Sequence, residues 1–303
     1  MVLTNTTTIG GPGGNLLVNG DFTCNSNAHV VGDVTVTGNA SLTNNCRIDG
    51  TLWVGGTVKA DSSPHIGGNL QSGGQVTIQS TVRISGYLAT AAGLTVLDGK
   101  SVANLKTIGT VHGEIYTAAS TLPLPAVAAP AVPTPETTGA ETSWGAWLKS
   151  IAVGAGAPSW SAALQTKPGC VLSTSTVGTA KLTVTGNTVV DATGAACPTV
   201  TLQGLAIDLK ADLTLKVNAL GSTNGLKVTA SDGRPHKLTI VAGSGSGSLI
   251  RLVGPTSIDP QVTANLTSSG TVQIDGSTDL TGTIRASRLV TSGAVTVHAT
   301  GGA

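Results

Sequence analysis

Small residues recur every six positions along the first third of this chain, and this period limits the fold more than any other feature. Residues 14–103 divide into fifteen words of six positions, and three words make one repeat unit. Two of the three words begin with a small residue, usually glycine, and the third begins with a polar residue. Such a repeat is typical of a solenoid, in which each unit is one coil and each word is one side of that coil.

Positions inside the words alternate between apolar and polar residues. Of the 30 third and fifth positions, 26 hold an aliphatic residue, an aromatic residue or cysteine, and the exceptions are Pro64, Ser72, Thr90 and Lys100. A period of two places these side chains on one side of a strand. The sequence therefore predicts an all-β fold over residues 14–117, a parallel β-helix (solenoid) with triangular turns of three words each.

The composition fits a fold without an aromatic core. The 303 residues include 41 Gly but one Phe and one Met, only 10% are charged, and the net charge is +1. Stacked backbone ladders and aliphatic columns must then supply the stability. Because there is no basic run, we expect no nucleic-acid partner. We also expect no membrane span, since no stretch of about 18 apolar residues occurs.

The rest of the chain divides into three further segments. Residues 1–13 are polar and Gly-rich, and we expect them to cap the first coil. Residues 118–169 form a Pro- and Ala-rich connector with a short helix, in which Trp144 and Trp147 lie on one face. Residues 170–303 return to alternating apolar and polar positions, which predicts a second β-rich, solenoid-like module.

One outward column of the first module carries repeated apolar residues. Its mid-strand members are Leu17, Thr35, Trp53, Gln71 and Ala89. An apolar column that faces outward is usually covered by something. We expect that either the helix with Trp144 and Trp147 or another subunit packs on it.

The four cysteines form two candidate disulfides. Cys24 and Cys46 both point inward from neighbouring coils, which lie about 4.8 Å apart, so a bridge between them is geometrically allowed. Cys170 and Cys197 can pair in the same way. The alternative is that these are small core residues with free thiols. Two bridges would favour an oxidising compartment, extracellular or at the cell surface.

Histidine and arginine alternate along a second outward column. His29, Arg47, His65 and Arg83 follow one another at intervals of one repeat unit and should therefore stack about 4.8 Å apart. This His/Arg column is a candidate site for an acidic polysaccharide or for the acidic face of a partner. The alternative is a solvated column, since outward positions must hold polar residues and Asp49, Asp33 and Asp21 lie nearby.

Signals for catalysis are scarce, so we predict no enzymatic activity. Asp208 and Asp212 can share one face of a strand, but no base or ligand set accompanies them. Asp232 to His236 is typical of a turn. No cofactor or metal is expected, because the remaining histidines are scattered. An ice-binding array fits less well, because Lys59 interrupts the most Thr-rich column.

Three segments resemble the bactofilins, polymer-forming β-helical proteins whose turns carry apolar-x-Gly-x-apolar words: RIDGTLWVGGTVKA, GGNLQSGGQVTIQ and VQIDGSTDLTGTIRA. The resemblance covers residues 14–103 well and residues 272–293 faintly. It implies a right-handed triangular coil that assembles end to end without a nucleotide. The cysteine pairs, the connector and the large second module depart from that family and favour an extracellular or pilus-associated relative. No functional residues carry over, because the family motif is a packing motif.

These features predict a non-enzymatic structural protein, secreted or on a bacterial cell surface. It would assemble into or decorate a filament or appendage, through self-association or contact with other surface-structure subunits. The alternative is an adhesin that holds an acidic glycan or polymer on the His/Arg column. A β-helix polysaccharide-active enzyme and an ice-binding protein are the weaker alternatives.

Overall fold

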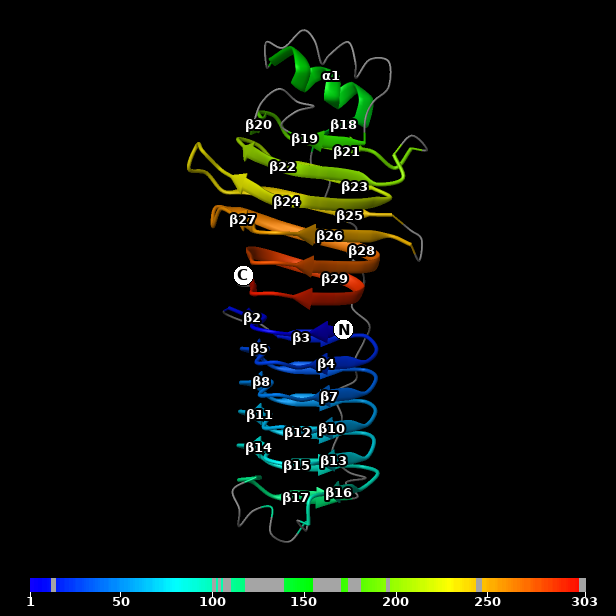
Figure 1. Cartoon of the computed structure of the whole chain (residues 1–303), viewed down its shortest axis with the longest axis vertical. Helices are drawn as coiled ribbons and strands as arrows, with labels where there is room; N and C mark the ends of the chain where they lie inside the picture. The colour runs from blue at the N-terminus through cyan, green and yellow to red at the C-terminus, as the bar shows by residue number, and fades with distance from the viewer. Residues whose placement is uncertain are drawn as a thin grey trace. The chain divides into compact units, whose positions relative to one another are not determined.

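The computed structural model describes residues 1–11, 15–99, 102, 105, 110–117, 139–154, 170–173, 181–194, 197–243 and 247–299, without the side chains of 149 and 151–154. The chain divides into two units (Figure 1): unit 1 comprises Met1–Ala131 with Val290–Ala303, and unit 2 comprises Val132–Leu289. Each unit is a coil of strands stacked in parallel, with one helix described, in unit 2. The predicted all-β solenoid is therefore confirmed.

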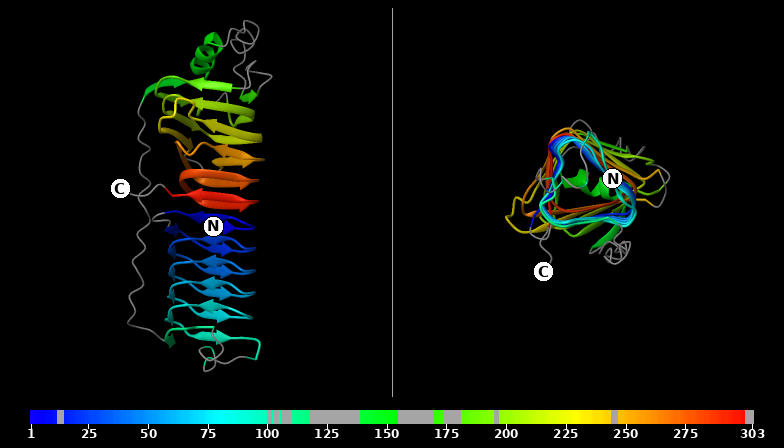
Figure 2. Two further views of the ribbon diagram at one scale, coloured as in Figure 1. Left: turned by 90° about the vertical axis from the view of Figure 1, so that its left-hand side faces the viewer. Right: turned by 90° about the horizontal axis from the view of Figure 1, so that it is seen from below.

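Unit 1 has three sides, and each side is a column of strands that recur once per repeat unit between residues 16 and 96. The interval is longer at both ends of the columns, where Leu88 pairs with Ile115 and Val2 pairs with Thr23. The first side holds β3 (Leu16–Val18), β6 (Val34–Val36), β9 (Leu52–Val54), β12 (Leu70–Ser72), β15 (Leu88–Thr90) and β17 (Ile115–Thr117). The second holds β1 (Val2–Leu3), β4 (Phe22–Cys24), β7 (Ala40–Leu42), β10 (Val58–Ala60), β13 (Val76–Ile78) and β16 (Leu94–Val96). The third holds β2 (Thr8–Gly10), β5 (His29–Val30), β8 (Arg47–Ile48), β11 (His65–Ile66) and β14 (Arg83–Ile84). Viewed along the coil, these strands outline a triangle (Figure 2).

The inside of unit 1 is aliphatic. Leu52, Leu70 and Leu88 follow one another in register and are fully buried. The polar exceptions Ser72 and Thr90 are also buried, and their hydroxyls donate hydrogen bonds to the carbonyls of corner glycines. These two side chains therefore satisfy their own polarity inside the coil. The fourth exception, Lys100, and the ends of the repeat at 14 and 103 lie outside the described residues.

The corners of unit 1 are of two physical kinds. At most glycine corners the neighbouring coil is too close for a side chain; a Cβ on Gly74 would lie 2.6 Å from the carbonyl oxygen of Gly56, whereas Gly20 has open space and a φ of 112°. At the polar corners the backbone is left-handed, with φ values of 49° at Asn44 and 60° at Asn45. Asn is one of the few residues that tolerates this conformation. Steric contact thus selects glycine at one kind of corner, and backbone conformation selects polar residues at the other.

The residue after a glycine corner links one coil to the next at several positions of unit 1. The Asp33 carboxylate accepts a hydrogen bond from the backbone N–H of Thr51 (2.7 Å), and the Thr51 hydroxyl accepts one from Asn69 N–H (3.2 Å). The Asn69 side chain in turn accepts from Tyr87 N–H (3.0 Å). These side chains serve the stacking of coils.

The two ends of the chain lie side by side in unit 1. Residues 1–10, expected to be a cap, form β1 and β2, which stack on β4 and β5. On its other edge β2 pairs with β30 (Val295–His298), and the Thr4 hydroxyl donates to the carbonyl of Thr291. Residues 290–303 therefore belong to unit 1, whereas the alternation of apolar and polar positions predicted that they belong to the second module.

Unit 2 is a less regular coil. Its strands are β18 (Ala140–Ser143), β19 (Val171–Ser173), β20 (Lys181–Val184), β21 (Thr188–Asp191), β22 (Val200–Leu209), β23 (Leu213–Val217), β24 (Ala219–Thr229), β25 (His236–Ala242), β26 (Leu249–Val253), β27 (Thr256–Ile258), β28 (Val262–Asp275) and β29 (Thr278–Ser292), which continues into unit 1. Thr188 pairs with Leu213 on the next coil, whereas Ala219 pairs with the more distant Leu249, so the length of a coil changes along the unit. This variation hides the period in the sequence.

The helix with the tryptophans belongs to unit 2. Helix α1 (Trp144–Gly154) follows β18 directly and contacts β18 and β21. Trp144 and Trp147 are each 5% exposed, with ring centroids 5.4 Å apart. The structure therefore places this face on unit 2, where it covers the first coil, instead of on the apolar column of unit 1. A helix that starts where a strand ends is held near that strand, which favours the local contact. The connector residues 118–138 and 155–169 lie outside the described residues.

Candidate functional site

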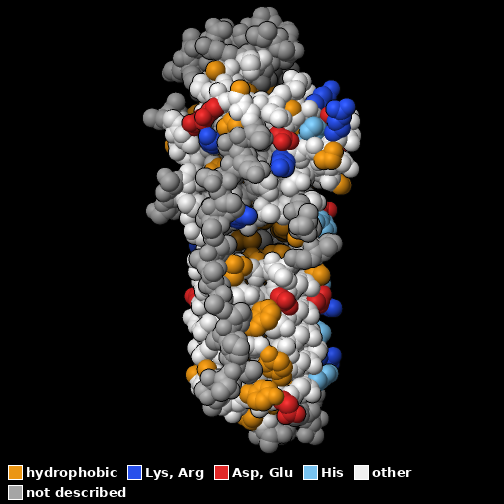
Figure 3. All heavy atoms as spheres, turned by 180° about the vertical axis from the view of Figure 1, so that it is seen from behind, with side chains coloured by type: hydrophobic (Ala, Val, Ile, Leu, Met, Phe, Trp, Pro, Cys, Tyr) orange, Lys and Arg blue, Asp and Glu red, His pale blue; other side chains and the backbone are white. Residues whose placement is uncertain are grey.

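The predicted His/Arg column is present on the third side of unit 1. His29 is paired in register with Arg47, Arg47 with His65, and His65 with Arg83. Each residue shares a short strand with an inward Val or Ile that is fully buried. The buried partner fixes which way the strand faces, so the His or Arg must point outward. Histidine and basic side chains alternate along one edge of the lower part of Figure 3.

Asp49 neutralises the first half of the column. Its carboxylate is 2.8 Å from His29 Nε2 and 2.6 Å from Arg47 Nε. Partial burial opposes ionisation of Asp49, but the hydrogen bonds from Arg47 and His29 outweigh it and lower its pKa. His29 and Arg47 therefore fit the alternative interpretation, a solvated column with balanced charge.

In the second half of the column, no described carboxylate forms an ion pair with His65 or Arg83. Among the residues that the structure describes, the Arg83 side chain makes no ion pair or hydrogen bond. His65 Nε2 lies 3.4 Å from the hydroxyl of Ser85. Burial lowers the pKa of His65 below its ordinary value of 6.5, and the positive charge of Arg47 lowers it further. At neutral pH, Arg83 is therefore the exposed cation of this half.

A shallow pocket lies beside Arg83. It has a volume of about 280 Å³ and is lined by Asn45, Ser63, His65, Thr81 and Arg83. Sequence reasoning identified only His65 and Arg83 of this set. Asn45, Ser63 and Thr81 could have been found, because they also recur once per repeat unit and each precedes a column residue by two positions. The pocket presents hydrogen-bond donors and one guanidinium, which suits an anion.

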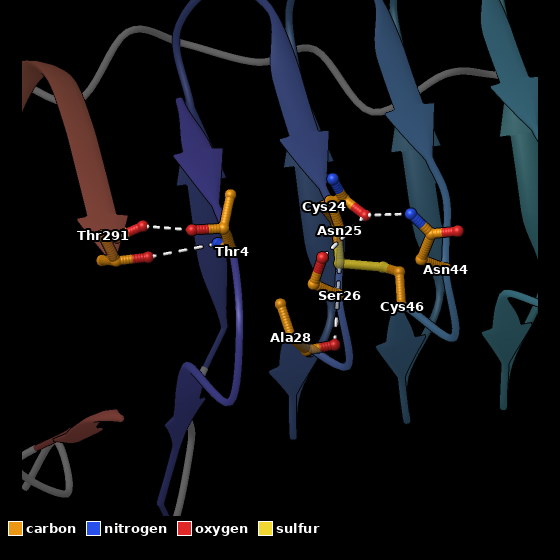
Figure 4. The surroundings of a disulfide bond; sticks show 8 residues. All are labelled: Thr4, Cys24, Asn25, Ser26, Ala28, Asn44, Cys46 and Thr291. Carbon is orange, nitrogen blue, oxygen red and sulfur yellow. Dashed lines mark hydrogen bonds between the residues drawn. A yellow bond between two sulfur atoms is a disulfide. The ribbon is translucent and has the colours of Figure 1, made fainter. Parts of the chain in front are cut away.

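Both predicted disulfides are present. Cys24 is bonded to Cys46 and Cys170 to Cys197, with Cα–Cα distances of 5.5 Å and 5.4 Å. Figure 4 shows that the first bridge joins neighbouring coils, beside a hydrogen bond from the Asn44 amide to Asn25. Cross-links of this kind are typical of proteins in oxidising compartments.

The apolar column is also in register. Leu17 lies beside Thr35, Thr35 beside Trp53, and the column continues through Gln71 and Ala89. Ala89 is paired further with Tyr116, whose ring packs edge-on against Tyr87 at 6.1 Å. Leu17 and Tyr116 are 41% and 46% exposed, whereas Ala89 is buried. Trp53, in the middle of the column, is half-buried and Gln71 is buried, so Leu17 and Tyr116 near the two ends are the most exposed apolar residues of this column.

The acidic residues of unit 2 have structural partners. Asp208 is buried and accepts hydrogen bonds from Lys181 Nζ (2.8 Å) and from the hydroxyl of Ser231 (2.7 Å). Burial opposes its ionisation, but these bonds outweigh burial and lower its pKa strongly. Asp212 accepts from the backbone N–H of Lys237 at 2.9 Å. The two carboxylates are therefore held by different partners.

The described residues lack two further features. They contain no group of three or more His, Cys, Asp or Glu side chains arranged to hold a metal ion. They also contain no helix of the length and apolarity needed to cross a membrane.

No protein-family model, curated protein or solved structure matches this chain. The resemblance to bactofilins therefore stays a prediction that rests on the repeated words alone.

Proposed function

We propose that this chain is a non-enzymatic structural protein, secreted or exposed at a cell surface, that builds a filament or appendage by self-association. The observation that carries the proposal is the use of polar side chains in unit 1. Asp33, Thr51 and Asn69 each accept a backbone hydrogen bond from the next coil, so their polar groups serve coil stacking. Polar side chains that hold neighbouring coils together are expected in a protein whose role is to form a stiff rod.

The cross-links support the same role. Each unit carries one disulfide, and Cys24 and Cys46 are both almost completely buried. A disulfide limits the freedom of the unfolded chain and therefore stabilises a coil that works outside the cell, where the environment keeps such bonds oxidised.

The apolar column gives the proposal a contact surface. Leu17 and Tyr116 are large, apolar over much of their surface and exposed on one side of unit 1. Apolar groups that a monomer exposes in one column are typical of a protein–protein contact. We assign the self-association to this side, and a second copy of the chain is the partner that the proposal requires.

The test is the mass of the oxidised full chain over a concentration series, measured by light scattering and by negative-stain microscopy. We expect the mass to rise with concentration and filaments to form. Leu17→Lys and Tyr116→Lys should each suppress growth, because a charge on the contact side must be desolvated. Thr77→Lys adds the same charge to an outward position of the second side and should leave growth unchanged. A wild-type chain that stays monomeric up to its solubility limit would contradict the proposal.

A further inference from the structure

We propose that the pocket beside Arg83 binds a sulfate or phosphate group carried by an acidic polymer. This binding function goes beyond the structural role and does not depend on self-association. It concerns one half of the His/Arg column, between the coil that carries Ser63 and the coil that carries Arg83.

The distribution of charge selects this half. Asp49 bonds to both His29 and Arg47, so an incoming anion there would compete with a carboxylate already in place. Arg83 is exposed and has no carboxylate partner among the described residues. An anion at Arg83 therefore gains a charge-assisted contact without displacing an existing one.

The donors around Arg83 suit a tetrahedral oxyanion. The hydroxyls of Ser63 and Thr81 line the pocket, are exposed and make no hydrogen bond with another described residue. Asn45 already donates one amide hydrogen to Asn27 at 3.2 Å, which holds this side chain at the pocket wall. A sulfate or phosphate arranges its oxygens tetrahedrally and can therefore accept hydrogen bonds from a guanidinium and hydroxyls that lie in different directions, whereas the two oxygens of a carboxylate lie in one plane.

The coil fixes these groups before any ligand arrives. The backbone of Ser63 is left-handed, with φ of 67°, and the inward neighbours Ile66 and Ile84 are fully buried. The positions of the pocket residues are therefore set by the stacking of the coils. The backbone therefore needs little ordering on binding, and the cost that remains is the ordering of the exposed Arg83 side chain.

His65 gives the site a dependence on pH. The charged groups that face it are Arg47, Arg83 and His112, which oppose its protonation, and Asp49, which favours it. Its pKa in the free protein lies below 6.5, so His65 is neutral near pH 7 and gains a proton as the pH falls below that value. A bound anion would favour the protonated form. Binding should therefore tighten between pH 7 and pH 5.

The test is a calorimetric titration of the full chain with three probes at low salt. Heparin oligosaccharides carry sulfate, polyphosphate carries phosphate, and polygalacturonate carries carboxylate. We expect heparin or polyphosphate to bind and polygalacturonate to bind more weakly. The higher affinity among heparin and polyphosphate shows whether the natural polymer is sulfated or phosphorylated. Arg83→Gln should weaken binding about tenfold, since a charge-assisted contact is lost.

Arg47→Gln is the matched control, because it removes the same charge from the half of the column that Asp49 neutralises. It should change the affinity less than about twofold, and His65→Ala should remove the increase in affinity at pH 5. Unfolding curves check that each variant is folded.

Two results would overturn the proposal. Equal losses in Arg83→Gln and Arg47→Gln would show diffuse attraction to the column instead of a site. Absence of binding to all three probes by the folded wild-type chain would remove the site altogether. Either result leaves the mass of the assembled chain as a separate measurement, so failure of this proposal and failure of the structural role are distinguishable.

Discussion

Replacing Gly74 with alanine would place a methyl group against the backbone of the preceding coil. The added Cβ would lie 2.6 Å from the carbonyl oxygen of Gly56, 2.7 Å from its carbonyl carbon and 2.8 Å from the nitrogen of Thr57. Ordinary van der Waals contact begins at 3.4 Å. The two coils would therefore have to separate locally by up to 3.4 − 2.6 = 0.8 Å.

This separation has a cost that can be worked out from the neighbouring hydrogen bond. The backbone N–H of Gly74 donates to the carbonyl of Gly56 at 2.8 Å. Lengthening by a similar amount would take the bond beyond the normal range for N–H···O contacts. Overpacking costs about 1–3 kcal/mol and the lost bond about 1 kcal/mol, so we expect a loss of about 2–4 kcal/mol. For a unit of this size, Tm should fall by about 5–15 °C.

The assay is urea and thermal unfolding followed by far-UV circular dichroism. Gly221→Ala is the control, because its Cβ would meet nothing within 4 Å and its φ is not in the left-handed region. The control should change the free energy of unfolding by less than about 1 kcal/mol, and an increase is the expected sign. If Gly74→Ala has the same urea midpoint as the wild type, the coils can relax around a methyl group, and close approach is not the reason for glycine at these corners.

Three further changes test other contacts. The double substitution Cys24→Ser, Cys46→Ser opens a loop with a sequence separation of 22. It should lower the free energy of unfolding by about 3 kcal/mol in the chain-entropy model. A reducing agent should then have no added effect on the stability of unit 1, and a persisting effect would contradict the stabilising role of this disulfide. Asp208→Asn removes a buried carboxylate from its bonds and should cost about 2–3 kcal/mol at pH 7. Because the pKa of Asp208 is lowered, this contribution is fully present above the ordinary value of 3.8 and declines as the pH falls below that value. The free energies of unfolding of wild type and variant should therefore approach each other in acid. A constant difference down to pH 2 would exclude the carboxylate as the cause. Trp147→Ala uncovers the first coil of unit 2 and should lower the free energy of unfolding by about 3 kcal/mol. Hydrogen exchange should become faster in β21 and stay unchanged in β13. If β21 exchanges at the same rate in the variant and the wild type, α1 does not act as a cover.

The regular coil could be predicted almost completely from the sequence. Alternation with a period of two decides which side chains are inside, and the period of six decides where the corners lie. Once both are fixed, the partner of every residue lies one repeat unit away, as His65 and Arg83 illustrate. The pairing of Cys24 with Cys46 follows from the same frame.

The candidate site could be predicted only in part. The column of His29, Arg47, His65 and Arg83 follows from the period, but its division into two unequal halves does not. That division depends on the side-chain rotamer of Asp49, which places its carboxylate beside His29 and Arg47. A side-chain rotamer is decided by neighbours in space, and a repeat in the sequence carries no information about it.

By itself, the sequence determined what one coil looks like, because strand alternation and corner preference are local properties of the chain. Only the tertiary structure decided which coils meet where the repeat is interrupted. It placed α1 on unit 2 and paired β2 with β30, almost the whole length of the chain away. The physical reason is that the unpaired backbone groups at the edge of one parallel coil are nearly the same as those of any other. The choice among edges is therefore made by the fit of whole coils and by a few contacts such as that of Thr4 with Thr291.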